Sequence, residues 1–135
     1  MALILIVFLF PLSCDNGTKP KIVSASITVP AITAVSNPMQ FGAVSALSGW
    51  NEHFQSGDVT YRLSIDGGEL LPDGTTTVAG AGLSNGTHTI TQTFFYKNNP
   101  ISGGSRTGTI GVLSNAIASI TQTFPALTLN LSKEL

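Results

Sequence analysis

The chain has little of what nucleic-acid-binding proteins and disulfide-stapled domains need. Only 10% of its 135 residues are charged, and six basic against seven acidic side chains give a formal net charge of -1. Because there is no basic excess, neither a nucleic acid nor an anionic membrane surface is expected as an electrostatic partner. The single cysteine excludes an intramolecular disulfide. The fold must therefore be stabilised by its apolar core.

Motifs of catalysis and metal binding are also missing. The two histidines, His53 and His88, each stand alone, and the chain has no H-x-H, H-E-x-x-H, paired cysteines or G-x-S-x-G. Asp66, Glu69 and Asp73 share one turn-rich stretch, but their spacing matches no standard calcium loop. The sequence therefore predicts no enzyme, no catalytic residue, no cofactor and no metal site.

No hydrophobic run is long enough to span a bilayer. Residues 2–10 are all apolar, but a helix of that length crosses only about half of a ~30 Å hydrocarbon layer. The run has the length of the apolar core of a secretion signal, and the small Ser13 fits cleavage before Cys14. Residues 1–13 are therefore predicted to be a signal peptide.

The sequence around Cys14 suggests what the single cysteine does. Pro11-Leu12-Ser13-Cys14 resembles the lipobox of bacterial lipoproteins, in which cleavage precedes a cysteine that carries a lipid. The resemblance implies lipidation of Cys14, a tether over residues 14–20, and a lipid anchor to a bacterial membrane, with the domain on its extracellular or periplasmic face. The polar, Gly- and Pro-containing composition after Cys14 suits a tether. The alternative is that Cys14 is a small apolar residue ending a cleaved signal or a buried N-terminal segment.

Beyond the tether, apolar and polar residues alternate with a period of two. The clearest alternation covers residues 22–29, 59–65 and 126–132, with weaker strands expected at 39–47, 76–83, 88–96, 107–113 and 117–124. Turn-forming dipeptides separate these runs, and no window shows a helical apolar stripe. We therefore predict one all-β domain over residues 21–135, an antiparallel two-sheet sandwich of seven to eight strands.

Two segments of the domain are similar to each other. Residues 83–94 and 113–124 both begin Leu-Ser-Asn and end Ile-Thr-Gln-Thr-Phe. This pattern puts Gln92 and Gln122 on an inward face, where an unpaired amide costs a few kcal/mol. We expect the two amides to bond to one another across neighbouring strands, the alternative being a wet face. The adjacent aromatic residues 94–96 require one ring to face outward, at a contact surface or under a loop over residues 98–106.

Two further segments carry a family resemblance. Tyr61-Arg62-Leu63-Ser64-Ile65-Asp66-Gly67-Gly68, followed by Gly82-Leu83-Ser84-Asn85-Gly86-Thr87-His88-Thr89-Ile90-Thr91, resembles bacterial immunoglobulin-like and fibronectin type III-like surface domains. The resemblance implies an immunoglobulin-like sandwich used outside the cell for spacing, adhesion or ligand display, without catalytic residues.

The strongest candidate for ligand binding is the loop over residues 48–57. It gathers the only Trp of the chain with amide, imidazole and phenyl side chains, at Trp50, Asn51, His53 and Phe54. Aromatic faces and amide donors are what sugar rings and protein partners contact. The alternative is that Trp50 and Phe54 fold back and cap the core.

Together these features predict a non-catalytic lipoprotein of the bacterial cell envelope that serves as a binding, adhesion or structural module, with a glycan or protein partner at the cell surface. One alternative is a glycan-binding module that uses the Trp50/Phe54 loop. Another is a structural subunit of a virion or filament, because charge-poor, Thr- and Gly-rich sandwiches are common in such assemblies.

Overall fold

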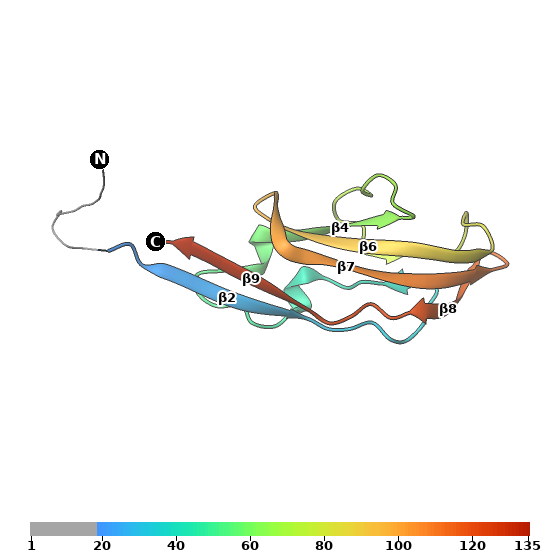
Figure 1. The fold of residues 1–135 in the computed structure, drawn as a ribbon, viewed down its shortest axis with the longest axis horizontal. Helices are drawn as coiled ribbons and strands as arrows, with labels where there is room; N and C mark the ends of the chain where they lie inside the picture. The colour runs from blue at the N-terminus through green and yellow to red at the C-terminus, as the bar shows by residue number, and fades with distance from the viewer. Residues whose placement is uncertain (1–18) are drawn as a thin grey trace, which may run out of the picture.

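A computed structural model describes residues 19–135, and over this range the chain is built from β-strands (Figure 1). Two single-turn 3-10 helices, η1 (Val44–Ala46) and η2 (Ser56–Asp58), interrupt them. The strands are β2 (Ile22–Val29), β3 (Met39–Gln40), β4 (Val59–Ile65), β5 (Thr77–Val78), β6 (Gly86–Tyr96), β7 (Asn99–Leu113), β8 (Ala116–Gln122) and β9 (Leu127–Glu134). The all-β prediction is confirmed.

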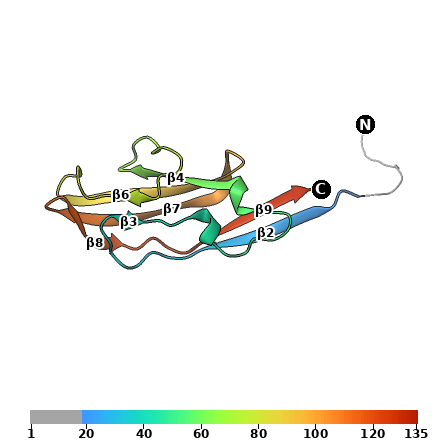
Figure 2. The same cartoon turned by 180° about the vertical axis from the view of Figure 1, so that it is seen from behind.

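The strands form three antiparallel groups. The largest is a four-stranded sheet in the order β4-β6-β7-β8, and the others are the pairs β2-β9 and β3-β5. The β2-β9 pair, here called the terminal ribbon, projects past one end of the four-stranded sheet (Figures 1 and 2). The molecule is therefore elongated along the direction of its strands.

The terminal ribbon follows from strict alternation in both of its strands. Burial in β2 alternates residue by residue, and β9 pairs with it from Ile22↔Glu134 to Val29↔Leu127. The alternation places apolar side chains of both strands on one face, where Ile27 and Leu129 are fully buried. The other face meets solvent and carries mostly serine and threonine, together with Ile22, Asn130 and Glu134.

Strands β6, β7 and β8 follow one another as a meander joined by two tight turns. Lys97 and Asn98 form one turn and Ser114 and Asn115 the other, all four with positive φ between 48° and 68°. Two successive residues with positive φ are typical of type I′ hairpins, whose twist matches that of the flanking strands.

Strand β7 is longer than predicted. The sequence indicated a loop over residues 98–106, because Pro100, Gly103 and Gly104 favour turns. The structure instead continues β7 from Asn99, with a register irregularity opposite Thr93 and Phe95 that absorbs the bend. The expected covering loop is thus part of the sheet.

Two other predicted strands are much shorter in the structure. Only residues 39–40 of the predicted strand 39–47 pair, because the chain turns at Gly42 (φ 81°) and then forms η1. Only residues 77–78 of the predicted strand 76–83 pair, and Gly82 (φ 88°) turns the chain toward β6. At both positions the chain changes direction through a positive φ, which glycine adopts without a steric penalty.

The two similar segments are not equivalent in the fold. Gln92 is buried and accepts a hydrogen bond from Nε of Arg106 at 2.8 Å, whereas Gln122 is exposed. The expected pairing of the two amides is therefore wrong. The reason lies in the strand order, because β7 lies between β6, which carries Gln92, and β8, which carries Gln122.

All three strand groups contribute buried side chains to one core cluster. Phe54, Phe94 and Phe124 are its largest fully buried side chains. Phe124 meets Phe41 edge-on, with 5.2 Å between ring centroids. Within residues 19–135 we find no helix that is long and apolar enough to cross a membrane.

Candidate functional site

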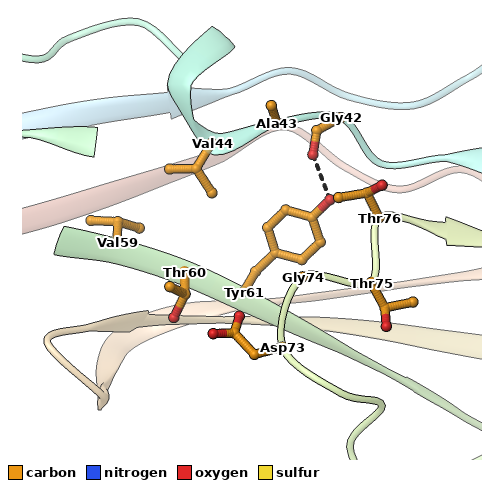
Figure 3. A pocket seen from close by; sticks show the side chains of 10 residues that line it. All are labelled: Gly42, Ala43, Val44, Val59, Thr60, Tyr61, Asp73, Gly74, Thr75 and Thr76. Atoms are coloured by element: carbon orange, nitrogen blue, oxygen red, sulfur yellow. Dashed lines mark hydrogen bonds between the residues drawn. The ribbon is translucent and has the colours of Figure 1, made fainter. Parts of the chain in front are cut away.

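A cavity of about 240 Å³ opens beside β4, next to the side chain of Tyr61 (Figure 3). Three segments surround it: the turn after β3, the first half of β4, and the loop that leads to β5. The lining residues are Gly42, Ala43, Val44, Val59, Thr60, Tyr61, Asp73, Gly74, Thr75 and Thr76.

Tyr61 joins two of these segments. Its hydroxyl donates a hydrogen bond to the carbonyl oxygen of Gly42 at 2.5 Å, and its side chain is almost fully buried. Burial raises the pKa of Tyr61 to about 12, against a smaller opposing effect of the Arg106 charge. The phenol therefore stays protonated at neutral pH and serves as a structural donor, not as a catalytic base.

A second cavity, of about 290 Å³, adjoins the first. Thr60 and Asp73 line both cavities, and Arg62, Phe95 and Asn98 complete the second. Nε of Arg62 donates to the carbonyl oxygen of Leu71 at 2.9 Å, which ties the Asp66–Thr76 loop to β4. The two cavities offer hydroxyl groups and one charge of each sign, an arrangement suited to holding a small polar ligand.

The Trp50–Phe54 loop is closed by hydrogen bonds of Asn51. Oδ1 of Asn51 accepts from the backbone N–H groups of His53 at 2.8 Å and Phe54 at 3.1 Å. Its Nδ2 donates to the carbonyl oxygen of Ser24 in β2 at 3.1 Å, and Nζ of Lys133 in β9 donates to the carbonyl oxygen of His53 at 2.6 Å. The loop is thereby fastened to the terminal ribbon.

The aromatic residues of this loop face the core. Phe54 is fully buried beside Tyr96, with 5.8 Å between ring centroids. Trp50 packs against the core, and within residues 19–135 its buried Nε1 has no hydrogen-bond partner. Of the four predicted ligand contacts, Phe54 is thus fully buried in this structure. Trp50 and His53 are half-buried, and Asn51 is exposed.

Sequence reasoning missed a cluster around His88. Nδ1 of His88 lies 2.6 Å from Oδ2 of Asp66, and its Nε2 lies 2.7 Å from the carbonyl oxygen of Ser84. The hydroxyl of Ser84 is 3.4 Å from Nε2, so the set has the composition of a hydrolytic triad. The sequence does place an acid at the end of one predicted strand and a histidine at the start of another. Only the pairing register of β4 with β6 shows that the two residues meet.

The hydrogen-bonding geometry of this cluster differs from that of a triad, because Nε2 of His88 is closer to the carbonyl oxygen of Ser84 than to its hydroxyl. The Asp66 carboxylate and the Ser84 carbonyl are both acceptors, so the geometry favours an imidazole that donates from both ring nitrogens. The bond to Asp66, followed by the bond to Ser84, raises the pKa of His88, and the bond from His88 followed by that from Thr89 lowers the pKa of Asp66. The bonds of Asp66 to His88 and to the backbone of Thr89 tie the start of β6 to the turn after β4.

The acidic stretch that follows β4 does not gather into a metal site. Asp66 is engaged with His88 and with the backbone of Thr89, and Asp73 lies at the two cavities. In the part of the chain that the structure describes, no three His, Cys, Asp or Glu side chains lie close enough to hold a metal ion. Cys14, the predicted lipidation site, lies outside the described residues.

Comparison with known proteins adds no relative. No protein family, no curated protein and no solved structure matches this chain. The functional argument is therefore based on the geometry of the chain itself.

Proposed function

We propose that the chain is a non-catalytic module of the bacterial cell envelope, held by a lipid on Cys14, which presents an immunoglobulin-like sandwich for binding or adhesion. The observation that carries the proposal is the placement of both ends of the domain. The backbone N–H of Leu135 donates to the carbonyl oxygen of Lys21 at 2.9 Å, at the outer end of the terminal ribbon (Figure 1). A tether that precedes Lys21 would hold the four-stranded sheet away from the membrane.

The immunoglobulin-like architecture is supported by the way the core is shared. Ile27 and Leu129 of the terminal ribbon and Ile90 and Ile110 of the four-stranded sheet are all fully buried in one core cluster. Two antiparallel layers packed over a common core are the basic plan of such sandwiches. Here the second layer consists of the two strand pairs.

A non-catalytic role is supported by the state of the groups that could react. His88 is doubly engaged as a donor, and Tyr61 keeps its proton. Both groups thus have structural hydrogen-bond partners. This pattern is typical of groups that hold a fold together rather than groups poised for proton transfer.

The outer face of the four-stranded sheet favours a hydroxylated partner. Cross-strand hydroxyl pairs line it, with Thr91–Thr107 and Thr93–Ser105 each 3.2 Å apart, and Thr109–Thr121 2.6 Å apart. Hydroxyl groups both donate and accept, so this face can bond to a neutral partner such as a glycan without ionic contacts. A glycan is therefore the partner class that we favour. Its contact surface would be this hydroxyl-lined face of the sheet and not the ring of Phe54.

Lipidation tests the anchor directly. The full-length chain and Cys14→Ser are expressed in a bacterium with lipoprotein-processing enzymes and fed labelled palmitate, and their intact masses are measured. We expect label in the Cys14 chain alone, together with loss of residues 1–13. An unlabelled chain with an intact N-terminus would refute the anchor and leave the virion or filament subunit as the next hypothesis, testable by sedimentation of the Lys21–Leu135 fragment over a wide concentration range.

The surface is tested by retention on immobilised cell-wall polysaccharides. We expect Thr91→Val with Thr107→Val to weaken retention while the fold is kept, because valine preserves the shape of threonine and removes its hydroxyl. Trp50→Ala is the comparison for the loop hypothesis. If retention is weaker for Trp50→Ala alone, the binding site lies in the Trp50–Phe54 loop and not on the outer face of the sheet.

A further inference from the structure

Arg106 is a buried cation on the inward face of β7. Only 5% of its surface is exposed. Its Nε donates to Oε1 of Gln92, and its Nη1 donates to the carbonyl oxygens of Pro30 at 2.6 Å and Pro125 at 2.9 Å. A guanidinium has five N–H groups, and these three bonds use Nε and both Nη1 hydrogens. Within residues 19–135, the two Nη2 hydrogens have no hydrogen-bond partner.

The charge of Arg106 has no carboxylate partner within residues 19–135. Both ion pairs in this range involve a histidine, His53–Glu52 and His88–Asp66. The titratable neighbour of Arg106 is Tyr61, which is neutral because burial raises its pKa to about 12. Burial lowers the pKa of Arg106 itself, but an arginine in a protein keeps its proton. A positive charge therefore sits in the core opposed only by carbonyl and amide dipoles.

A cavity of about 250 Å³ is bordered by this arginine. One side of the cavity is formed by residues 29–32, at the end of β2 and just after it. The other side is formed by the segment 40–47. Apart from Arg106 and Gln40, every lining side chain is apolar, including Val29, Ile32, Phe41 and Leu47. An apolar cavity with one buried cation at its wall is complementary to an anion with an apolar body.

We propose that this cavity binds a short aliphatic carboxylate, with the chain against the apolar wall and the carboxylate toward Arg106. Nη2 of Arg106 would supply charge-assisted hydrogen bonds, which are stronger than neutral ones in a site of low dielectric. The ligand would also balance a charge that is otherwise costly to bury. This cavity borders the one beside Tyr61, with which it shares Gly42 and Ala43, and it is distinct from the outer face of the four-stranded sheet.

The test compares three ligands that share one chain, octanoate, octanol and octylamine, by calorimetric titration and by the rise in melting temperature. Octanoate is expected to bind saturably, octanol about ten- to hundredfold more weakly, and octylamine not at all. Equal affinity for octanoate and octanol would overturn the proposal, as would the absence of saturable octanoate binding, because either result means that Arg106 only fastens the carbonyls of Pro30 and Pro125.

A cavity-filling variant locates the site without removing the arginine. Ala46 lines the cavity and is exposed, so Ala46→Phe would fill the space while the Arg106 bonds remain. The matched control is Ala118→Phe, at an exposed position of β8 that borders none of the cavities described above. We expect octanoate affinity to fall at least about tenfold in Ala46→Phe and to be unchanged in Ala118→Phe. Equal loss in both variants, or in neither, would contradict the assignment.

Discussion

At the scale of single residues, Gly108 shows how closely the core is packed. A Cβ atom added at Gly108 would lie 2.7 Å from ring atoms of Phe124, which is fully buried. We therefore expect Gly108→Ala to lower the free energy of unfolding by about 1–3 kcal/mol through overpacking. Urea unfolding checks this, with Gly57→Ala as the control, because a Cβ there meets nothing within 4 Å. Similar stability of the two variants would mean that Phe124 can move aside.

His88 predicts a dependence of stability on pH. Its folded pKa is raised, so its contribution is complete below the unfolded value of about 6.5 and is lost as pH rises through the folded pKa. The folded pKa of Asp66 is lowered, so its contribution is present above about 3.9 and is lost on acidification. The contact between Asp66 and His88 should thus stabilise the fold most between these two pH values.

The measurement is the denaturant concentration at the unfolding midpoint, taken across pH 4–9. In the natural chain this midpoint should fall as the pH rises on the alkaline side. The fall should disappear in His88→Gln and persist in the control His53→Gln. A fall that persists unchanged in His88→Gln would show that another group causes it.

These residue contacts could not be predicted from the sequence, because each depends on strand register. Gln92 was correctly placed on an inward face, but its partner Arg106 is 14 residues away on the next strand. Asp66 and His88 are 22 residues apart. Alternation identifies which face a side chain is on, and only pairing identifies what it meets there.

At the scale of elements, the meander turns use residues that are not ideal for their backbone. Ser114 and Asn115 have φ of 52° and 64° in the β7–β8 turn, a region in which Asn and Gly are favoured. Replacing the pair by Asn-Gly should therefore raise the free energy of unfolding by about 1 kcal/mol. The backbone N–H of Ser114 would keep its bond to Oδ1 of Asn85. The same replacement at Pro72-Asp73, where neither residue has positive φ, is the control, and equal gains at both turns would contradict the explanation.

The elements were predicted well where alternation was long and poorly where glycine intervened. Strands β2, β4 and β9 lie within a residue or two of their predicted ranges, because both faces of each strand are clearly marked. The predicted strand at 39–47 fails at Gly42, and the loop predicted at 98–106 is strand because the irregularity in β7 accommodates its glycines. A glycine permits a turn without requiring one, so the sequence alone cannot decide between them.

At the scale of the whole molecule, the last strand completes the core. β9 supplies Leu129 and Leu131, both buried, and pairs with all of β2. Ending the chain after Pro125 should therefore abolish the cooperative thermal transition in calorimetry. A cooperative transition in the chain without β9 would show that the meander folds alone.

The terminal ribbon also determines how the molecule would respond to mechanical load. Because β2 and β9 are antiparallel and their outer ends are adjacent, a force between the two termini opens Ile22↔Glu134 first and then the remaining pairs one at a time. A force between the N-terminus and the far end of the four-stranded sheet instead pulls β2 lengthwise past β9, which loads all of the ribbon's hydrogen bonds together. A molecule tethered before Lys21 and gripped by its sheet would therefore resist pulling far better than one gripped at Leu135.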